Sequence, residues 1–277
     1  MKFGVTLRNM GPEATPQTVK DCAQAAEACG FESIWITDHL AIPPDDAEGS
    51  EGHYLDPLTT LAYLAGVTDT IRLGTGVLIL PYRPKLPTAK QIATLQTLAQ
   101  NRLILGIGAG WMAAEFKALG VNRRRRGAIT DDTLDFINAC FSSDEVVLNE
   151  QPFLFKPRPA RPEILVGGSA PHALKRAAAF ADGWLPMVAN PEKLAEDLQA
   201  YRALTQGLGQ PDGNVSVMTR LPVAQNDPTH DLLTRYHLLG VDRLVHALRY
   251  KTVSEYEAEL IALKQHVENF ESEQLNT

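Results

Sequence analysis

Short apolar runs alternate with longer amphipathic segments along almost the whole chain. The apolar runs have the length of buried strands, whereas the segments between them repeat their apolar positions at helical spacing. The predicted strands cover residues 2–7, 33–36, 71–80, 103–110, 164–166, 182–185, 215–223 and 242–245. The predicted helices cover residues 16–29, 56–68, 88–100, 111–119, 127–141, 171–180, 191–206, 227–239 and 254–270.

This alternation predicts an α/β protein with parallel strands, because each helix returns the chain to the same end of the sheet. Eight such units favour a closed (β/α)8 TIM barrel with insertions in the strand-to-helix loops. The 277 residues, 44% of them hydrophobic, suffice for a single barrel domain over residues 1–277. Two segments stand outside the repeat: a polar loop at 41–55, which is a candidate lid, and a predicted hairpin at 145–155.

The fourth predicted strand ends in glycines at every second position, namely Gly106, Gly108 and Gly110. Alternate residues of a strand share one face, so one face of this segment carries no side chains. Glycine in a strand often marks the close approach of a ligand or of another backbone. Two interpretations follow: a flat ligand lying across bare backbone, or tight packing of the strand against a helix.

Composition narrows the class of partner. The formal net charge is −7, from 26 basic and 33 acidic residues. A protein that binds nucleic acid usually has an excess of basic residues, so this composition argues against that class. No apolar run has the length of a membrane span. Cys22, Cys29 and Cys140 show neither metal-site spacing nor a disulfide framework, so we expect a reducing, cytoplasmic location. The expected partner is therefore a small-molecule substrate, with no nucleic acid and no membrane.

In a TIM barrel the chemistry lies at the C-terminal ends of the strands. Asp38 and His39 follow the second predicted strand, where they form an acid–base pair, part of a metal site, or a turn. The other histidines fall in predicted loops or helices, so no metal site is predicted. We expect His39 to form a hydrogen bond with a bound ligand.

Two further segments are candidates for binding an anion. Residues 167–171 (GGSAP) join the fifth strand to a helix, with Ser169 or Ala170 as the expected N-cap. The free amides at a helix start bind phosphate, although a tight turn explains the same residues. Residues 123–126 are four arginines, predicted to form a solvated loop with one arginine paired to Asp131 or Asp132. The alternative is that they reach the anionic tail of a ligand.

Four blocks of the sequence together resemble a known family. They are residues 29–39 (CGFESIWITDH), 71–83 (IRLGTGVLILPYR), 101–111 (NRLILGIGAGW) with Glu115 and Phe116, and 164–169 (ILVGGS) leading to 181–184 (ADGW). The chain resembles the luciferase-like monooxygenases of the bacterial luciferase superfamily. Within it, the chain is most similar to the oxidoreductases assigned to the deazaflavin coenzyme F-420.

The resemblance implies an oxidoreductase that uses reduced coenzyme F-420 or reduced FMN to reduce or monooxygenate a small organic substrate. It also implies a bulge with a non-proline cis peptide at Gly76–Val77, beneath the cofactor ring. The implied cofactor-binding residues are Asp38, His39, Gly76, Val77, Gly108, Ala109, Gly110, Gly167, Gly168 and Ser169. A separate reductase that supplies reduced cofactor and a homodimeric assembly are further implications.

The predicted catalytic residues are His39, Asp38 and Trp111. In the sugar-phosphate dehydrogenases of the family, a glutamate that acts on substrate stands at the position of Trp111. That dehydrogenase activity is therefore not expected here, and Glu115, one helical turn further on, is not assigned the missing role. We interpret Trp111 as an apolar wall for a hydrophobic or conjugated substrate.

The two cofactors share a tricyclic ring, a ribityl chain and a phosphate, so the same loops serve either one. Coenzyme F-420 has an additional acidic tail, for which the candidate partners are Arg83, Lys85 or the arginines at 123–126. Two other functions remain open from sequence: a non-catalytic flavin-binding barrel and a metal-dependent TIM-barrel hydrolase.

Overall fold

The computed structural model describes residues 1–47, 49–187, 190–224 and 226–274. Its central sheet contains β1 (Lys2–Thr6), β2 (Ser33–Ile36), β3 (Arg72–Thr75), β4 (Leu78–Ile79), β5 (Leu103–Gly108), β8 (Glu163–Gly168), β9 (Gly183–Pro186), β10 (Asn214–Thr219) and β11 (Arg243–His246). The strand order is β3-β2-β1-β11-β10-β9-β8-β5-β4, and a further pairing of β3 with β5 closes the barrel. β3 and β4 are two halves of one barrel strand, interrupted at Gly76–Val77. The predicted (β/α)8 barrel is thus confirmed.

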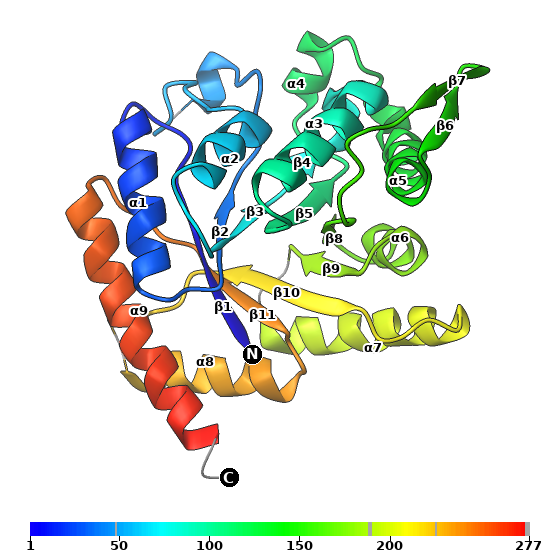
Figure 1. The fold of residues 1–277 in the computed structure, drawn as a ribbon. Helices are drawn as coiled ribbons and strands as arrows, with labels where there is room; N and C mark the ends of the chain where they lie inside the picture. Colours follow the sequence, from blue (N-terminus) through cyan, green and yellow to red (C-terminus); the bar gives the residue numbers. More distant parts are fainter. Residues whose placement is uncertain (48, 188–189, 225, 275–277) are drawn as a thin grey trace.

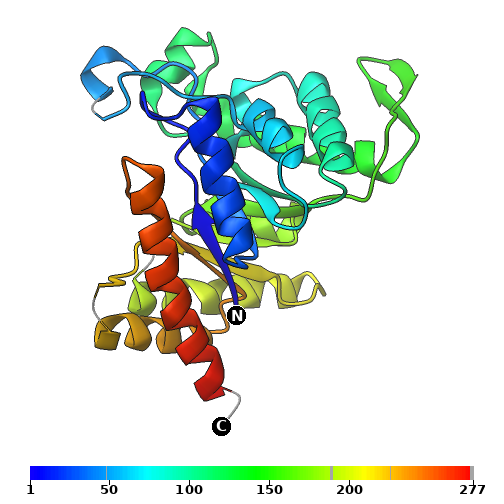
Figure 2. The same cartoon turned by 60° about the vertical axis from the view of Figure 1, so that its left-hand side comes forward.

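Eight helices surround the barrel in the described part of the chain (Figure 1). They are α1 (Pro16–Ala28), α2 (Pro57–Ala65), α3 (Lys85–Leu98), α5 (Arg126–Ser142), α6 (His172–Phe180), α7 (Pro191–Gly207), α8 (Asn226–Leu238) and α9 (Val253–Gln274). Figure 2 shows α9 beside α1, so the last helix completes the ring next to the first. α3 begins at Lys85, three residues before the start predicted at Thr88. The earlier start is possible because a proline such as Pro87 is tolerated in the first turn of a helix, and Thr88 Oγ1 donates a hydrogen bond to Pro84 O within that turn.

Insertions enlarge one end of the barrel. The loop after β2 contains a short 3-10 turn at Pro44–Asp46, and the segment after β5 contains α4 (Ala113–Ala118) and a second 3-10 turn at Arg123–Arg125. These are strand-to-helix insertions, as predicted. The hairpin of β6 (Glu145–Leu148) and β7 (Gln151–Leu154) is also confirmed. It lies in the helix-to-strand connection between α5 and β8 and projects away from the barrel (Figure 1).

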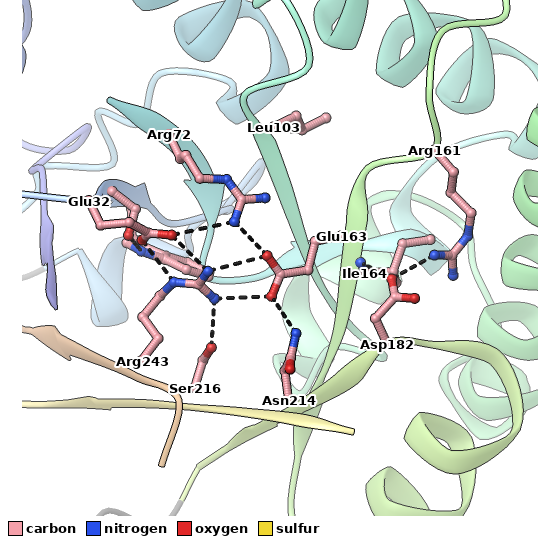
Figure 3. Close-up of polar contacts among 12 residues, drawn as sticks. Glu32, Arg72, Leu103, Arg161, Glu163, Ile164, Asp182, Asn214, Ser216 and Arg243 are labelled. Carbon is pink, nitrogen blue, oxygen red and sulfur yellow. Dashed lines mark hydrogen bonds and ion pairs between the residues drawn. The ribbon is translucent and has the colours of Figure 1, made fainter. Parts of the chain in front are cut away.

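A network of charged side chains fills the N-terminal end of the barrel (Figure 3). Arg243, 1% exposed, donates to Glu32 at 2.9 Å, to Glu163 at 3.2 Å and to Ser216 Oγ at 2.9 Å. Arg72 donates to Glu163 at 2.7 Å from the other side. All of these residues lie at or next to the N-terminal ends of strands. The network therefore connects β2, β3, β8, β10 and β11.

We expect Glu163 to make the protein sensitive to acid. Burial opposes its charge, but hydrogen bonds and charges of Arg243 and Arg72 lower its pKa to about 2 from 4.5. A depressed folded-state pKa gives stability that is present above the unfolded-state pKa and is lost as the pH falls through the folded-state pKa. Glu163 should therefore contribute about 3 kcal/mol at neutral pH, which is lost between about pH 5 and pH 2.

The measurement is the free energy of unfolding by urea at a series of pH values, for the wild type and for Glu163→Gln. The variant should show a shallower loss of stability over this pH range. Equal slopes for the two proteins would contradict this role of Glu163.

Candidate active site

An open cavity of about 340 Å³ lies at the C-terminal end of the barrel. Its wall includes Trp35 and Thr37 from the end of β2, His39 in the loop that follows, Gly76 between β3 and β4, and Met218 from β10. Trp35 also belongs to the apolar layer inside the barrel, together with buried side chains of β5, β8, β9 and β11. The barrel therefore stacks three layers: the ion network, an apolar layer, and the cavity at the end where TIM-barrel enzymes carry their chemistry.

The glycines of β5 make room for protein side chains. A Cβ atom on Gly108 would lie 2.6 Å from Val77 Cγ2, and one on Gly110 would lie 2.8 Å from Ile79 Cγ2. A Cβ atom on Gly106 would lie 2.1 Å from a backbone oxygen of β3. Tight packing therefore accounts for these glycines, although the packing partners come mainly from β3 and β4 rather than from a helix. The face of Gly108 is thus not bare, and a flat ligand lying against this segment stays a prediction.

Val77 occupies the space that these glycines leave. The Gly76–Val77 peptide bond is cis, as the resemblance implied. The two γ-methyl groups of Val77 lie against Gly108 on β5 and Gly167 on β8, where an added Cβ would approach within 2.6 Å and 2.7 Å. Three predicted cofactor-binding segments thus meet at one side chain, beside the cavity that Gly76 lines.

Asp38 lies beneath the cavity wall rather than on it. Its carboxylate accepts two hydrogen bonds from Arg83, at 2.6 and 2.9 Å, and one from Ile79 N at 2.8 Å. Arg83 also donates to Asp56 at 2.9 Å. The structure assigns Asp38 to anchoring β4 against the end of β2, which differs from the predicted catalytic and ring-binding roles. Arg83 is engaged in the same cluster, so it is not available as a surface partner for an acidic cofactor tail.

His39 meets a carboxylate that the sequence analysis did not assign. Its Nδ1 lies 3.0 Å from Oε2 of Glu115, a side chain with no exposed surface. Burial alone would raise the pKa of Glu115, but hydrogen bonds from Ala41 N, Leu40 N, His39 and Tyr82 outweigh it and lower the pKa. The available sequence signal was a lone acidic residue within the apolar start of the insertion after β5.

Aromatic and apolar side chains surround His39 on its outer side. The Tyr54 ring lies edge-on at 5.0 Å between centroids, and the Trp111 ring lies edge-on at 6.4 Å. Trp111 is 65% exposed and Leu40 is 42% exposed, which is unusual for such large apolar groups. Ala109, half-buried, links β5 to Trp111. Exposed apolar surface is therefore present next to His39, and its role as a wall for a substrate stays a prediction.

The predicted phosphate loop begins with Gly167 and Gly168, the last two residues of β8, and none of its residues lines the cavity. Trp184 Nε1 donates to Gly168 O at 2.9 Å and fixes this turn, while Ser169 is exposed. The sequence predicts Ser169 or Ala170 as the N-cap of α6, but neither residue takes that position. Pro171 takes that position after a cis Ala170–Pro171 bond and offers no side-chain cap.

The arginine run does not form the predicted ion pair. Asp131 binds Arg176 of α6, and Asp132 binds Lys85 of α3 at 2.9 Å. The expectation that one arginine of 123–126 pairs with Asp131 or Asp132 was wrong. The side chains of 123–125 are exposed in the 3-10 turn before α5, so they remain candidates for an anionic ligand, whereas Lys85 is already paired.

Three other features bear on the predicted site. Across the described ranges, no group of three or more His, Cys, Asp or Glu side chains is arranged to hold a metal ion. The helices of the described residues include none that is long and apolar enough to cross a membrane. Cys22 and Cys140 are buried as free thiols, and Cys29 caps the C-terminus of α1.

Comparison with known proteins identifies the family. The sequence profile described as luciferase-like monooxygenase matches residues 1–274. An uncharacterised protein of Mycobacterium tuberculosis is 31% identical over 206 residues, which are 68% of this chain and 71% of that protein. The F-420-dependent hydroxymycolic acid dehydrogenase of the same organism is 32% identical over 205 residues, 68% of this chain and 53% of that protein.

A solved structure extends the agreement to the fold. An F-420-dependent secondary alcohol dehydrogenase, in complex with an adduct of F-420 and acetone, superposes with a TM-score of 0.79 at 12% identity. The alignment covers 94% of this chain and 97% of the dehydrogenase. Profile, relatives and fold agree, and the chain belongs to the luciferase-like monooxygenase family.

Proposed function

We propose that this protein is an oxidoreductase that uses reduced coenzyme F-420 or reduced FMN to reduce or monooxygenate a small organic substrate. The observation that carries the proposal is the position of His39. This side chain lies on the wall of the cavity of about 340 Å³, and its Nδ1 lies 3.0 Å from the buried carboxylate of Glu115. A titratable side chain at a cavity beside an apolar rim is the arrangement expected of a site for proton transfer to an organic ligand.

The residues around Val77 fit a planar cofactor ring. The Val77 side chain lies between the backbones of Gly108 and Gly167, and the preceding Gly76 lines the cavity. Val77 would support one face of the ring, while Gly168 and Ser169 would hold the phosphate near the start of α6. When bound, the reduced cofactor would supply a hydride, or electrons for oxygen insertion, while the protein orients the reactants and excludes water.

The rim favours an apolar substrate. Trp111 and Leu40 together present exposed apolar surface next to His39, where a polar substrate would gain little. The similarity to an F-420-dependent dehydrogenase of hydroxymycolic acid supports this choice. His39 would exchange a proton with a hydroxyl or carbonyl group of such a substrate, and Trp111 would cover its apolar part.

The experiment that tests the proposal is an equilibrium titration of the purified protein with coenzyme F-420 and with FMN, each oxidised and reduced, followed by fluorescence. Preferential binding of F-420 with hydride transfer would support a deazaflavin-dependent enzyme. Preferential binding of reduced FMN with oxygen consumption would support a monooxygenase supplied by a separate reductase. Binding without turnover would support the non-catalytic flavin-binding barrel, and binding of neither cofactor would contradict the proposal.

Replacing Arg123, Arg124 and Arg125 with glutamine tests how the cofactors are distinguished. If these exposed side chains contact the acidic tail, the variant should bind F-420 about 10-fold more weakly, since each exposed charge contributes up to about 1 kcal/mol. FMN lacks the tail, so its affinity should not change and provides the internal control. Equal losses for both cofactors, or no loss, would contradict a role for these arginines.

We also propose that the protein is a homodimer. A measurement of its molar mass in solution would test this proposal.

A further inference from the structure

Glu115 is surrounded by hydrogen-bond donors from two other segments. Its Oε1 accepts from Leu40 N at 2.6 Å and from Ala41 N at 3.0 Å. Its Oε2 accepts from Tyr82 OH at 2.9 Å and lies 3.0 Å from His39 Nδ1. The carboxylate therefore links α4 to the loop after β2 and to the 3-10 turn at Leu80–Tyr82. Oε1 binds backbone amides, whereas Oε2 binds side chains.

The chemistry of these donors fixes the protonation of His39. An ionised carboxylate can only accept hydrogen bonds, so the Nδ1 atom that faces it must carry the proton. The neutral imidazole then has its lone pair on Nε2, because only one of its two nitrogens is protonated. In water the neutral histidine side chain favours the opposite form, with the proton on Nε2, so Glu115 reverses the intrinsic preference.

We infer that Glu115 is a positioning residue, which holds His39 with its proton on Nδ1 and leaves Nε2 as the proton acceptor for a ligand in the cavity. Its importance for turnover rests on the proposed function, whereas the protonation state does not. Nε2 would take one proton from a substrate hydroxyl during oxidation. In the reverse direction the imidazolium, with protons on both nitrogens, would return that proton to the carbonyl oxygen. The bound cofactor would accept the hydride when the hydroxyl is oxidised and would supply it when the carbonyl is reduced.

A purely structural role for Glu115 is the competing explanation, because its Oε1 joins two backbone amides. Glu115→Gln separates the two roles. Leu40 N and Ala41 N can only donate, so the amide oxygen of the new side chain must take the place of Oε1. The NH2 group then takes the place of Oε2 and donates to Nδ1 of His39. The variant should keep the links to the backbone but move the imidazole proton to Nε2.

The experiment is two-bond ¹H–¹⁵N NMR of the imidazole nitrogens at alkaline pH, without cofactor, with His39→Gln used to assign the signals. The wild type should show His39 with the proton on Nδ1, and Glu115→Gln should show it on Nε2. Tyr82→Phe is the matched control, because it removes a different donor from the same Oε2 atom and should leave the proton on Nδ1. A wild type with the proton on Nε2 would overturn the inference without any variant, and so would an unchanged form in Glu115→Gln.

Turnover provides a second readout. In the Ser-His-Asp triad, an Asp→Asn change that inverts the histidine tautomer lowers kcat by about 10⁴-fold. We expect Glu115→Gln to lower kcat at least about 10²-fold with little change in KM, and Tyr82→Phe to have a much smaller effect. Full turnover by Glu115→Gln with an inverted proton position would overturn the catalytic part of the inference. A wild type that shows the predicted proton position but no turnover with either cofactor would contradict the proposed function instead.

Discussion

Replacing His39 with glutamine should lower turnover by about 10²- to 10⁴-fold, the usual contribution of a positioned general acid or base. Glutamine retains a donor for the Glu115 carboxylate, so the loop after β2 should keep its position. It cannot exchange a proton near neutral pH, so only the proton transfer is removed. The measurement is single-turnover kinetics with saturating reduced cofactor, together with the cofactor dissociation constant and a thermal unfolding curve.

His237→Gln is the matched control, because it makes the same substitution at an exposed histidine near the N-terminal end of the barrel, away from the cavity. Its turnover should stay within about 2-fold of the wild type, since exposed substitutions away from a site have small effects. Wild-type turnover by His39→Gln would contradict the assignment of proton transfer to this side chain. A parallel loss of folding and turnover would instead show that His39 acts mainly through stability.

The strand ends were the part of the site most accessible from sequence. The alternating pattern located each barrel strand to within a few residues, and the TIM-barrel rule then placed His39, Gly76 and Gly167 at the same end. This succeeds because the period of apolar positions depends on the local structure alone. The same reasoning cannot show what fills the space between strands, so it leaves open whether a ligand or a side chain packs against Gly108, where the structure places Val77.

Asp38 and Glu115 show why the roles of carboxylates were harder to predict. Asp38 is adjacent to His39 in sequence, which suggests an acid–base pair, but successive residues of an extended chain point in opposite directions. Asp38 therefore turns to Arg83, and the carboxylate that reaches His39 comes from 76 positions further along the chain. A contact of this kind depends on how an insertion folds back over the barrel, which hydrophobic periodicity does not encode.

Arg243→Met should lower the free energy of unfolding by about 3–5 kcal/mol, the usual cost of breaking a buried ion pair from one side. The side chain is buried and contacts both Glu32 and Glu163. Its removal leaves two carboxylates close together inside the barrel, with only the partly exposed Arg72 bound to both of them. Methionine fills a similar length, so the loss should come mainly from the unpaired charges and not from a cavity.

The measurement is urea unfolding of Arg243→Met and of Arg235→Met, an arginine whose carboxylate partners Glu192 and Asp231 are both exposed. The control should lose less than about 1 kcal/mol, as is usual for surface ion pairs. A second readout tests the cause. Without Arg243 the pKa of Glu163 should rise towards its ordinary value, so Arg243→Met should lose less additional stability between about pH 5 and pH 2 than the wild type does. A large loss of stability with an unchanged pH dependence would indicate that packing around Arg243, and not its charge, holds this end of the barrel together.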